Sequence, residues 1–354
     1  MLAVVLALLA LQLGSLMAPA YACGCGAMLP DAQRHVTVDR EVSVVRWDGA
    51  EEQIVMQLTV TGDARTAAWI MPVPHRATVE LGESRLFSQL SEATAPERRT
   101  RHHFWPRNGD WPFDDSDTAG DAALPGAASG VGVVGRERLG PFDVARLTAT
   151  DSDALGDWLD DNGFSLPGRL DTALRPYVDQ GWEYVAVKLA PEEAGAVLGG
   201  ALDPLRLSFA SDDLVYPMRL SRLAKTPQSL GLYVLAEHRM EPASAIGGDA
   251  PRVSFAGRLT DTSGPLAGLT GGGTDFLTAL DQEFPRPSEI SGDHELRRAS
   301  SDAGYRQAYY VDKLLRVGGV PVWLLTVGGL VAVAVGVTVG VPYVRRRRVA
   351  GVVG

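Results

Sequence analysis

Few side chains in this sequence combine the residue types and spacing that chemistry requires, and two cysteines come first among them. Cys23 and Cys25 are separated by one glycine and are the only cysteines in 354 residues. Such a pair suits a redox site or half a metal site, but a disulfide across one residue closes a small ring, whereas ordinary disulfides join Cα atoms about 5.5 Å apart. A short local bridge, or two thiols of little consequence, is the simpler interpretation, because no ligand partners lie nearby in the sequence.

A histidine pair beside acidic residues is the second candidate. His102 and His103 precede Asp110, Asp114 and Asp115, a set that could bind a divalent metal. Adjacent histidines point to opposite sides of an extended strand, and residues 96–129 have the irregular composition of a flexible insertion. We therefore predict a solvated acidic loop and no metal site.

Catalytic motifs are not found in the sequence. It contains no G-x-S-x-G elbow, H-E-x-x-H pair, Walker loop or dinucleotide fingerprint. Paired carboxylates would suit glycoside hydrolysis, but among 43 acidic residues no pattern selects a pair. We assign no catalytic residue and no cofactor.

An uncharged apolar stretch near the C-terminus determines where these residues act. Residues 320–344 carry no charge and precede Arg345, Arg346, Arg347 and Arg348. Twenty-five residues at 1.5 Å each reach ~37 Å, more than the ~30 Å hydrocarbon core of a bilayer. We predict one transmembrane helix, with the arginines of residues 345–354 in the cytoplasm and the N-terminal part outside.

The same helix has small residues on one face. Gly328, Ala332, Gly336 and Gly340 recur every four residues, a spacing that allows two helices to approach closely and form a homodimer. A helix rich in Gly, Ala and Val also gives this spacing by chance. Both interpretations stay open.

The N-terminus has the features of a signal peptide. Residues 1–22 contain a short apolar region and end in Ala20-Tyr21-Ala22, an A-x-A cleavage signal before Cys23. An uncleaved anchor is the alternative, and acylation of Cys23 is disfavoured because Ala20 stands where a lipobox has leucine. The exterior part then carries a formal charge of about −14, since four of the 33 basic residues are in the tail, and this charge argues against nucleic acid and anionic lipid as partners.

The exterior residues favour a β-rich α+β fold. Residues 36–47 and 51–61 alternate in polarity around Asp48-Gly49 and predict a β-hairpin, and residues 67–71 predict a third strand. We also predict short helices at residues 84–94, 151–162, 167–178 and 275–282, with a glycine-rich loop at 264–274. Mostly antiparallel strands would form an exterior domain over residues 23–284, followed by a juxtamembrane linker with an interfacial helix at 285–319.

Several stretches resemble one family. Residues 68–74, with Trp69, Pro72 and Pro74, are similar to the signature of a secreted bacterial family known as domain of unknown function 2330. Residues 158–167 and 181–188, with Trp182, resemble its second stretch, and residues 216–221 its third. The resemblance implies a mostly actinobacterial protein with this topology and brings no catalytic residues. Physically, Trp69 and Trp182 suit a sheet core better than an open groove for an extended ligand, since buried aromatic residues are ordinary.

These features predict a single-pass cell-surface protein. We expect a non-catalytic binding or scaffolding role at the outer envelope, with an envelope protein or polymer as partner and no nucleic acid. The alternative is a membrane-tethered hydrolase acting on cell-wall polymers. Convergent buried carboxylates in a cleft would favour the hydrolase, and an exposed aromatic patch would favour the binding protein.

Overall fold

The computed structural model describes residues 25–31, 34–107, 110, 142–148, 152–191, 196–259, 263–270 and 276–350. The predicted signal peptide, Cys23 and residues 111–129 of the predicted flexible insertion lie outside these residues. The chain forms two compact units. Unit 1 comprises Met1–Ala95 and Gly130–Gln307, and unit 2 comprises Pro96–Ser129 and Ala308–Gly354.

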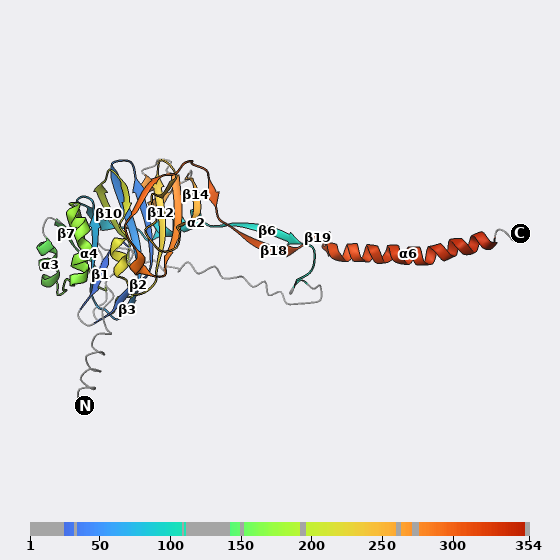
Figure 1. Ribbon diagram of the computed structural model, residues 1–354, viewed down its shortest axis with the longest axis horizontal. Helices are drawn as coiled ribbons and strands as arrows, with labels where there is room; N and C mark the ends of the chain where they lie inside the picture. The colour runs from blue at the N-terminus through green and yellow to red at the C-terminus, as the bar shows by residue number, and fades with distance from the viewer. Residues whose placement is uncertain are drawn as a thin grey trace, which may run out of the picture. The chain divides into compact units, whose positions relative to one another are not determined.

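Unit 1 is built mainly from antiparallel strands (Figure 1). Its strands are β1 (Ala27–Pro30), β2 (Val36–Trp47), β3 (Glu51–Gly62), β4 (Ala67–Val73), β5 (Thr78–Leu81), β7 (Phe142–Thr148), β8 (Glu183–Leu189), β9 (Gly200–Ala201), β10 (Leu205–Ala210), β11 (Leu214–Tyr216), β12 (Gln228–Ala236), β13 (Met240–Pro242), β14 (Arg252–Arg258), β15 (Phe276–Phe284), β16 (His294–Arg298) and β17 (Tyr305–Arg306). Its helices are α2 (Arg85–Ala93), α3 (Ser152–Asp161), α4 (Gly168–Asp179), α5 (Gly264–Thr270) and the 3-10 turns η1 (Arg219–Leu223) and η2 (Pro287–Glu289). The β-rich α+β prediction is confirmed.

Within the described residues, unit 1 contains two large sheets and one small one. The four-stranded sheet has the order β1-β4-β8-β7, and the nine-stranded sheet has the order β17-β14-β15-β12-β2-β3-β10-β5, with β9 on β3. The third sheet, β11-β16-β13, joins segments that lie far apart in the sequence. The predicted hairpin is confirmed as β2 and β3, and only β12 and β2 pair in parallel in the large sheet.

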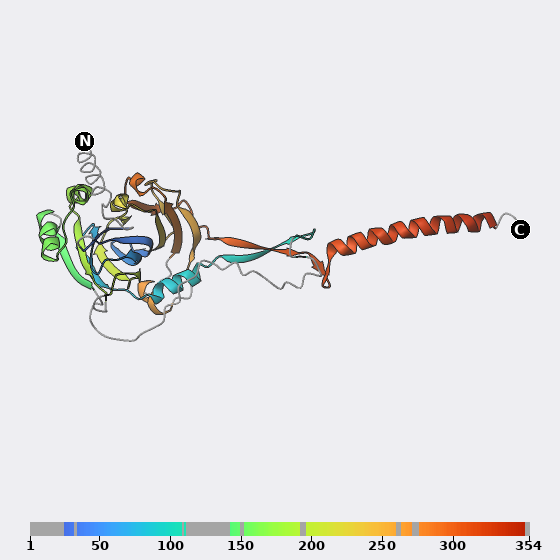
Figure 2. The ribbon, with the colours of Figure 1, turned by 90° about the horizontal axis from the view of Figure 1, so that it is seen from below.

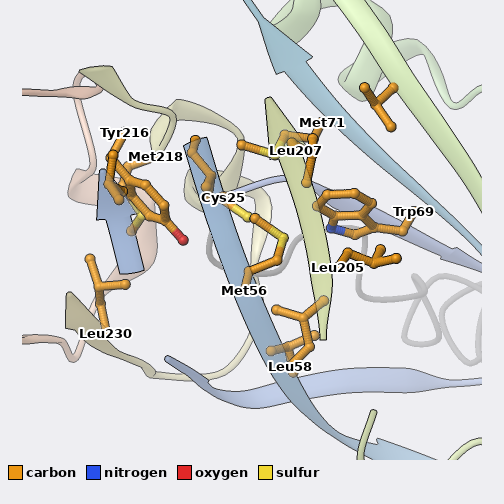
Figure 3. Close-up of a cluster of buried hydrophobic side chains, with 14 of the residues drawn as sticks. Cys25, Met56, Leu58, Trp69, Met71, Leu205, Leu207, Tyr216, Met218 and Leu230 are labelled. Atoms are coloured by element: carbon orange, nitrogen blue, oxygen red, sulfur yellow. The ribbon is translucent and has the colours of Figure 1, made fainter. Parts of the chain in front are cut away.

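Each large sheet buries both of its faces. One face of each sheet contributes to a central core that includes Met56, Trp69, Leu207 and Leu230 (Figure 3). The outer face of the four-stranded sheet packs against α3 and α4, which Figure 2 shows in green on its outer side. The outer face of the nine-stranded sheet packs against α2 and α5. Unit 1 is therefore a helix–sheet–sheet–helix sandwich, and each fully buried Leu or Ile stabilises it by ~1.5–3 kcal/mol.

The signature residues lie mainly in this sandwich. Trp69 is 0% exposed in the central core, as predicted, and Trp182 is half-buried against Tyr177, with ring centroids 5.0 Å apart. Strand β4 continues through Pro72, which was expected to end it. Strand β1 pairs with β4 only as far as Ile70, so the missing N–H of Pro72 costs no ladder bond on that side.

Two predictions in unit 1 are wrong. Residues 276–284 form the strand β15, where a helix was expected, because β12 and β14 pair with it on both sides. Residues 264–270 form the helix α5, where a loop was expected, and Leu266 and Leu269 pack under α2. Strand pairing at β15 and side-chain packing at α5 therefore override the local sequence preference.

Unit 2 consists of strands β6 (Glu97–His103), β18 (Ala308–Leu314), β19 (Arg316–Val317) and β20 (Val320–Pro321), followed by helix α6 (Val322–Ala350). Strands β6 and β18 pair in parallel as a two-stranded ribbon. The predicted interfacial helix within 285–319 is therefore wrong, since residues 308–314 are a strand. Part of the predicted flexible insertion, residues 97–103, is likewise an ordered strand.

Candidate functional site

Exposed charged and aromatic side chains gather on the β6–β18 ribbon. Its register pairs Arg98 with Tyr309, Arg101 with Asp312, and His102 with Lys313. Tyrosine and valine in β18 favour an extended strand, and β6 supplies the backbone partners. Because successive side chains alternate between the faces of a strand, the ribbon presents two different faces.

On one face of the ribbon, acidic and basic side chains form ion pairs with each other. Arg101 Nε lies 2.7 Å from Asp312 Oδ1, and Arg107 Nη1 lies 2.6 Å from Asp312 Oδ2. Arg99 pairs with Glu97 at 2.8 Å. Hydrogen bonding from Arg101 lowers the pKa of Asp312 to about 2, so this carboxylate stays ionised.

The opposite face has basic groups and no acidic side chain. We call Arg98, His102, Tyr309 and Lys313 the basic face. All four residues are exposed, and none of the three basic ones forms an ion pair with another described residue. The basic face therefore offers charge, hydrogen-bond donors and an aromatic ring to an external partner.

His103 and His102 take different places on β6. His103 Nε2 lies 2.6 Å from Asp110 Oδ2, whereas His102 belongs to the basic face. The other candidate metal ligands, Asp114 and Asp115, lie outside the described residues. As predicted, His102 and His103 therefore lie on opposite faces of strand β6.

The origin of the parallel ribbon lies in unit 1. Arg306 donates hydrogen bonds to the carbonyl oxygens of Ala93 and Ala95 at 2.9 and 2.7 Å, and its guanidinium stacks 4.7 Å from the Phe255 ring centroid. This clamp holds residue 95 beside residue 306, so the two chain segments that follow begin side by side and run in the same direction. Parallel strands need a long connection between them, and here the two strands lie about 200 residues apart in the sequence.

Helix α6 follows the ribbon within unit 2. The Val322 N–H donates to the Leu315 carbonyl oxygen at 2.9 Å, and the window Val322–Val339 is apolar enough to cross a membrane, with none of it buried. A Cβ added at Gly328 or Gly336 would meet nothing within 4 Å. The small-residue face, with Ala332 and Gly340, is thus open at those two glycines, and Arg345 to Arg348 lie in the last turns of the helix.

Carboxylates that sequence analysis did not single out are buried in unit 1. Glu41 is 1% exposed, accepts a hydrogen bond from the Cys25 N–H at 2.9 Å, and is also bonded by the Tyr216 and Ser43 hydroxyls. The Cys25 thiol lies 3.5 Å from Met56 Sδ, and Figure 3 shows the two side chains next to each other. The predicted bridge to Cys23 stays a prediction. Burial raises the pKa of Glu41.

Glu52 is the second such carboxylate. It is 0% exposed, and the Val215 N–H donates to its Oε2 at 3.2 Å, while Oε1 has no hydrogen-bond partner among the described residues. Burial raises the pKa of Glu52 well above its usual range. Both acids are enclosed by core side chains, so they lack the open cleft that hydrolysis needs.

Asp293 joins helix α4 to the third of the resembling stretches, residues 216–221. Its Oδ1 accepts hydrogen bonds from the Tyr177 hydroxyl at 2.6 Å, the Met218 N–H at 2.8 Å and the Arg219 N–H at 2.9 Å. Arg219 also stacks on the Tyr177 ring, 5.7 Å from its centroid. These residues hold α4 against η1, a structural role that a lone aspartate in the sequence does not reveal.

Comparison with known proteins gives a family and no activity. The crystal structure of baculovirus P35 aligns over 77% of this chain and 97% of its own, with 8% sequence identity and a TM-score of 0.31, a likeness too distant to inform the fold or function. None of the curated proteins matches the chain. The family model described as an uncharacterised protein conserved in bacteria matches residues 19–297, which include the signature residues Trp69, Pro72, Pro74 and Trp182. The chain therefore belongs to this bacterial family, domain of unknown function 2330.

Proposed function

We propose that this chain is a single-pass cell-surface protein that binds an anionic polymer of the cell envelope through the basic face of its ribbon. One observation carries the proposal. Arg98, His102 and Lys313 lie on the same face of the ribbon as Tyr309 with no acidic partner among the described residues, in the unit that also contains the apolar helix α6. A polymer that carries phosphate or carboxylate groups would supply the missing charges.

The topology supports an outward-facing ribbon. The A-x-A signal at residues 20–22 favours export of the N-terminal part, and the arginines 345–348 favour a cytoplasmic C-terminal tail. The total charge of −10 is the sum over the whole chain, whereas the described residues of the ribbon carry more basic than acidic groups.

The alternative function, hydrolysis of wall polymers, has weaker support. Glu41 and Glu52 are the most deeply buried carboxylates described, and core side chains enclose both. The aromatic residues Trp105, Tyr309 and Tyr310 are exposed, at 63%, 41% and 58%. An enclosed acid and an exposed aromatic group together favour binding over catalysis.

Binding to a defined polyanion tests the proposal. The full chain in nanodiscs of neutral lipid would be titrated with poly(glycerol phosphate), with dextran as the uncharged comparison. We expect the polyanion to bind, with an affinity that falls as salt rises, and the double variant Arg98→Gln/Lys313→Gln to weaken binding about tenfold or more.

The matched control removes the same charge elsewhere. Arg65 and Lys225 are exposed in unit 1, and Arg65→Gln/Lys225→Gln should leave the affinity within about twofold of the original. Equal losses in the two double variants, or no binding of the polyanion, would refute the basic face as the binding site.

A further inference from the structure

Unit 1 contains a second candidate site, unrelated to the ribbon. A cavity of about 240 Å³ lies between α3, α4 and β8, over the outer face of the four-stranded sheet. An apolar cavity of about 150 Å³ is sufficient to hold benzene, so this space accommodates one ring with a short substituent. Some of the lining residues, such as Tyr184, belong to stretches that resemble the family's second motif.

The base of the cavity is apolar. Leu155, Leu174 and Tyr184 line it and are 2%, 4% and 2% exposed, so the apolar surface open to a ligand comes from the half-buried Leu166 and Val178. The Tyr184 hydroxyl donates to the Leu174 carbonyl oxygen at 3.3 Å, so its one proton is already used. A ligand that enters would gain from burying a hydrocarbon group.

The rim of the cavity is charged and has an acidic excess. Asp171, Arg175 and Asp179 follow one another at intervals of four residues on α4, so they lie along one side of the helix. Arg175 Nη2 lies 3.4 Å from Asp171 Oδ2, and Asp179 pairs with no basic side chain among the described residues. The Arg175 side chain is 71% exposed, so this rim is open to solvent.

We infer that this cavity binds a small organic cation, with a ring or short alkyl group against Leu166 and Val178 and an ammonium group beside Asp171 and Asp179. The apolar wall fixes the size and the hydrocarbon character of the ligand, and the net negative rim selects its charge. This site is independent of the polymer-binding ribbon.

Three probes of equal size but different charge test the charge selection. The full chain in neutral-lipid nanodiscs would be titrated with 2-phenylethylamine, 2-phenylethanol and phenylacetate, with binding followed by ligand-observed NMR. We expect the amine to bind about two- to fivefold more tightly than the alcohol, as exposed charge pairs allow, and the carboxylate to bind most weakly. Equal affinities, or no binding of the amine at millimolar concentration, would overturn the inference.

Variants test the place of binding. Val178 lines the cavity and is half-buried, so Val178→Trp should fill the space and reduce amine binding at least tenfold, whereas Val197→Trp at a valine that is 51% exposed should not. Should Val178→Trp fail to fold, Asp171→Asn/Asp179→Asn keeps the site open and should make the amine bind no better than the alcohol, with Asp160→Asn as control. A preference for the amine that survives the double variant would show that the rim does not recognise the cation.

Discussion

Carboxylates in the two units of this protein have pKa values shifted in opposite directions, for different reasons. In the core of unit 1, burial raises the pKa of Glu41 and of Glu52, and neither forms an ion pair with a described basic residue. On the ribbon of unit 2, hydrogen bonds from Arg101 and Arg107 keep the pKa of Asp312 at about 2. Burial therefore sets the direction of the shift for these two acids of unit 1, and pairing sets it for Asp312 of unit 2.

This difference separates structural from functional residues. A buried acid in unit 1 acts through the hydrogen bonds that it accepts, so its loss should affect folding. The ribbon satisfies the acids of one face and leaves the bases of the other without partners, so a change there should affect binding. Four substitutions test this division.

Removal of Asp293 should have the largest effect. Asp293→Ala leaves the Tyr177 hydroxyl and the backbone N–H groups of Met218 and Arg219 without their acceptor in a mostly buried place. We expect unfolding of unit 1 to become easier by roughly 3–5 kcal/mol, measured by urea denaturation with tryptophan fluorescence. Asp312→Ala on the exposed ribbon is the control and should leave the same midpoint unchanged; equal shifts would break the comparison.

His294 should make unit 1 sensitive to acid. Its side chain is 3% exposed, and its Nε2 forms a hydrogen bond with Gln282 Oε1 at 2.8 Å. Its Nδ1 has no hydrogen-bond partner among the described residues. Burial lowers the pKa of His294 to about 4. Between pH 6.5 and 4 the unfolded chain takes up a proton that the native state excludes, so stability falls as the pH falls, by ~3 kcal/mol over this interval. His294→Gln should remove that part of the fall, and a variant whose stability declines as steeply as the original would contradict the assignment.

Glu52 should act in the opposite direction. Because the pKa of Glu52 is raised in the folded state, its contribution to the free energy of unfolding is fully present below the ordinary pKa of 4.5. That contribution is lost as the pH rises towards the pKa of the folded state. The neutral isostere Glu52→Gln should therefore be more stable than the original at pH 8, with a smaller difference at pH 4.5, by thermal denaturation. A variant less stable at pH 8 would show that Glu52 is ionised in the fold.

The smallest effect is expected in helix α6. Gly336→Ile puts a large side chain on the open small-residue face and should weaken self-association by about 1 kcal/mol in a membrane reporter, without changing the stability of unit 1. Val335→Ile, one residue along the helix, is the matched control. An unchanged reporter signal for Gly336→Ile would remove the homodimer from consideration.

Local patterns predicted the parts of the fold whose partners are close in sequence. The hairpin β2–β3 followed from Asp48-Gly49 between two alternating runs. The ribbon could not be predicted in this way, because Arg98 and Tyr309 are brought together by the clamp of Arg306 on Ala93 and Ala95. Sequence analysis considered only His102 and His103 of β6 and placed β18 in a juxtamembrane linker with an interfacial helix, and long-range pairing joined the two strands into one site.

The sequence alone determined the apolar helix, the arginine tail, the hairpin and the buried role of Trp69, since each depends on composition or on neighbours along the chain. Only the tertiary structure decided which side chains of β2 face the central core. Val36 and Val38 face it, but the pairing register with β3 shifts between Val38 and Arg40. A bulge of one residue reverses the alternation, so Glu41, Ser43 and Val45 turn towards that core while Val44 packs against the α2–α5 layer. Because both faces of the sheet are buried, either alternation would bury valines. Contacts with Cys25, which precedes β1, and with Tyr216 of β11 select the one that encloses Glu41.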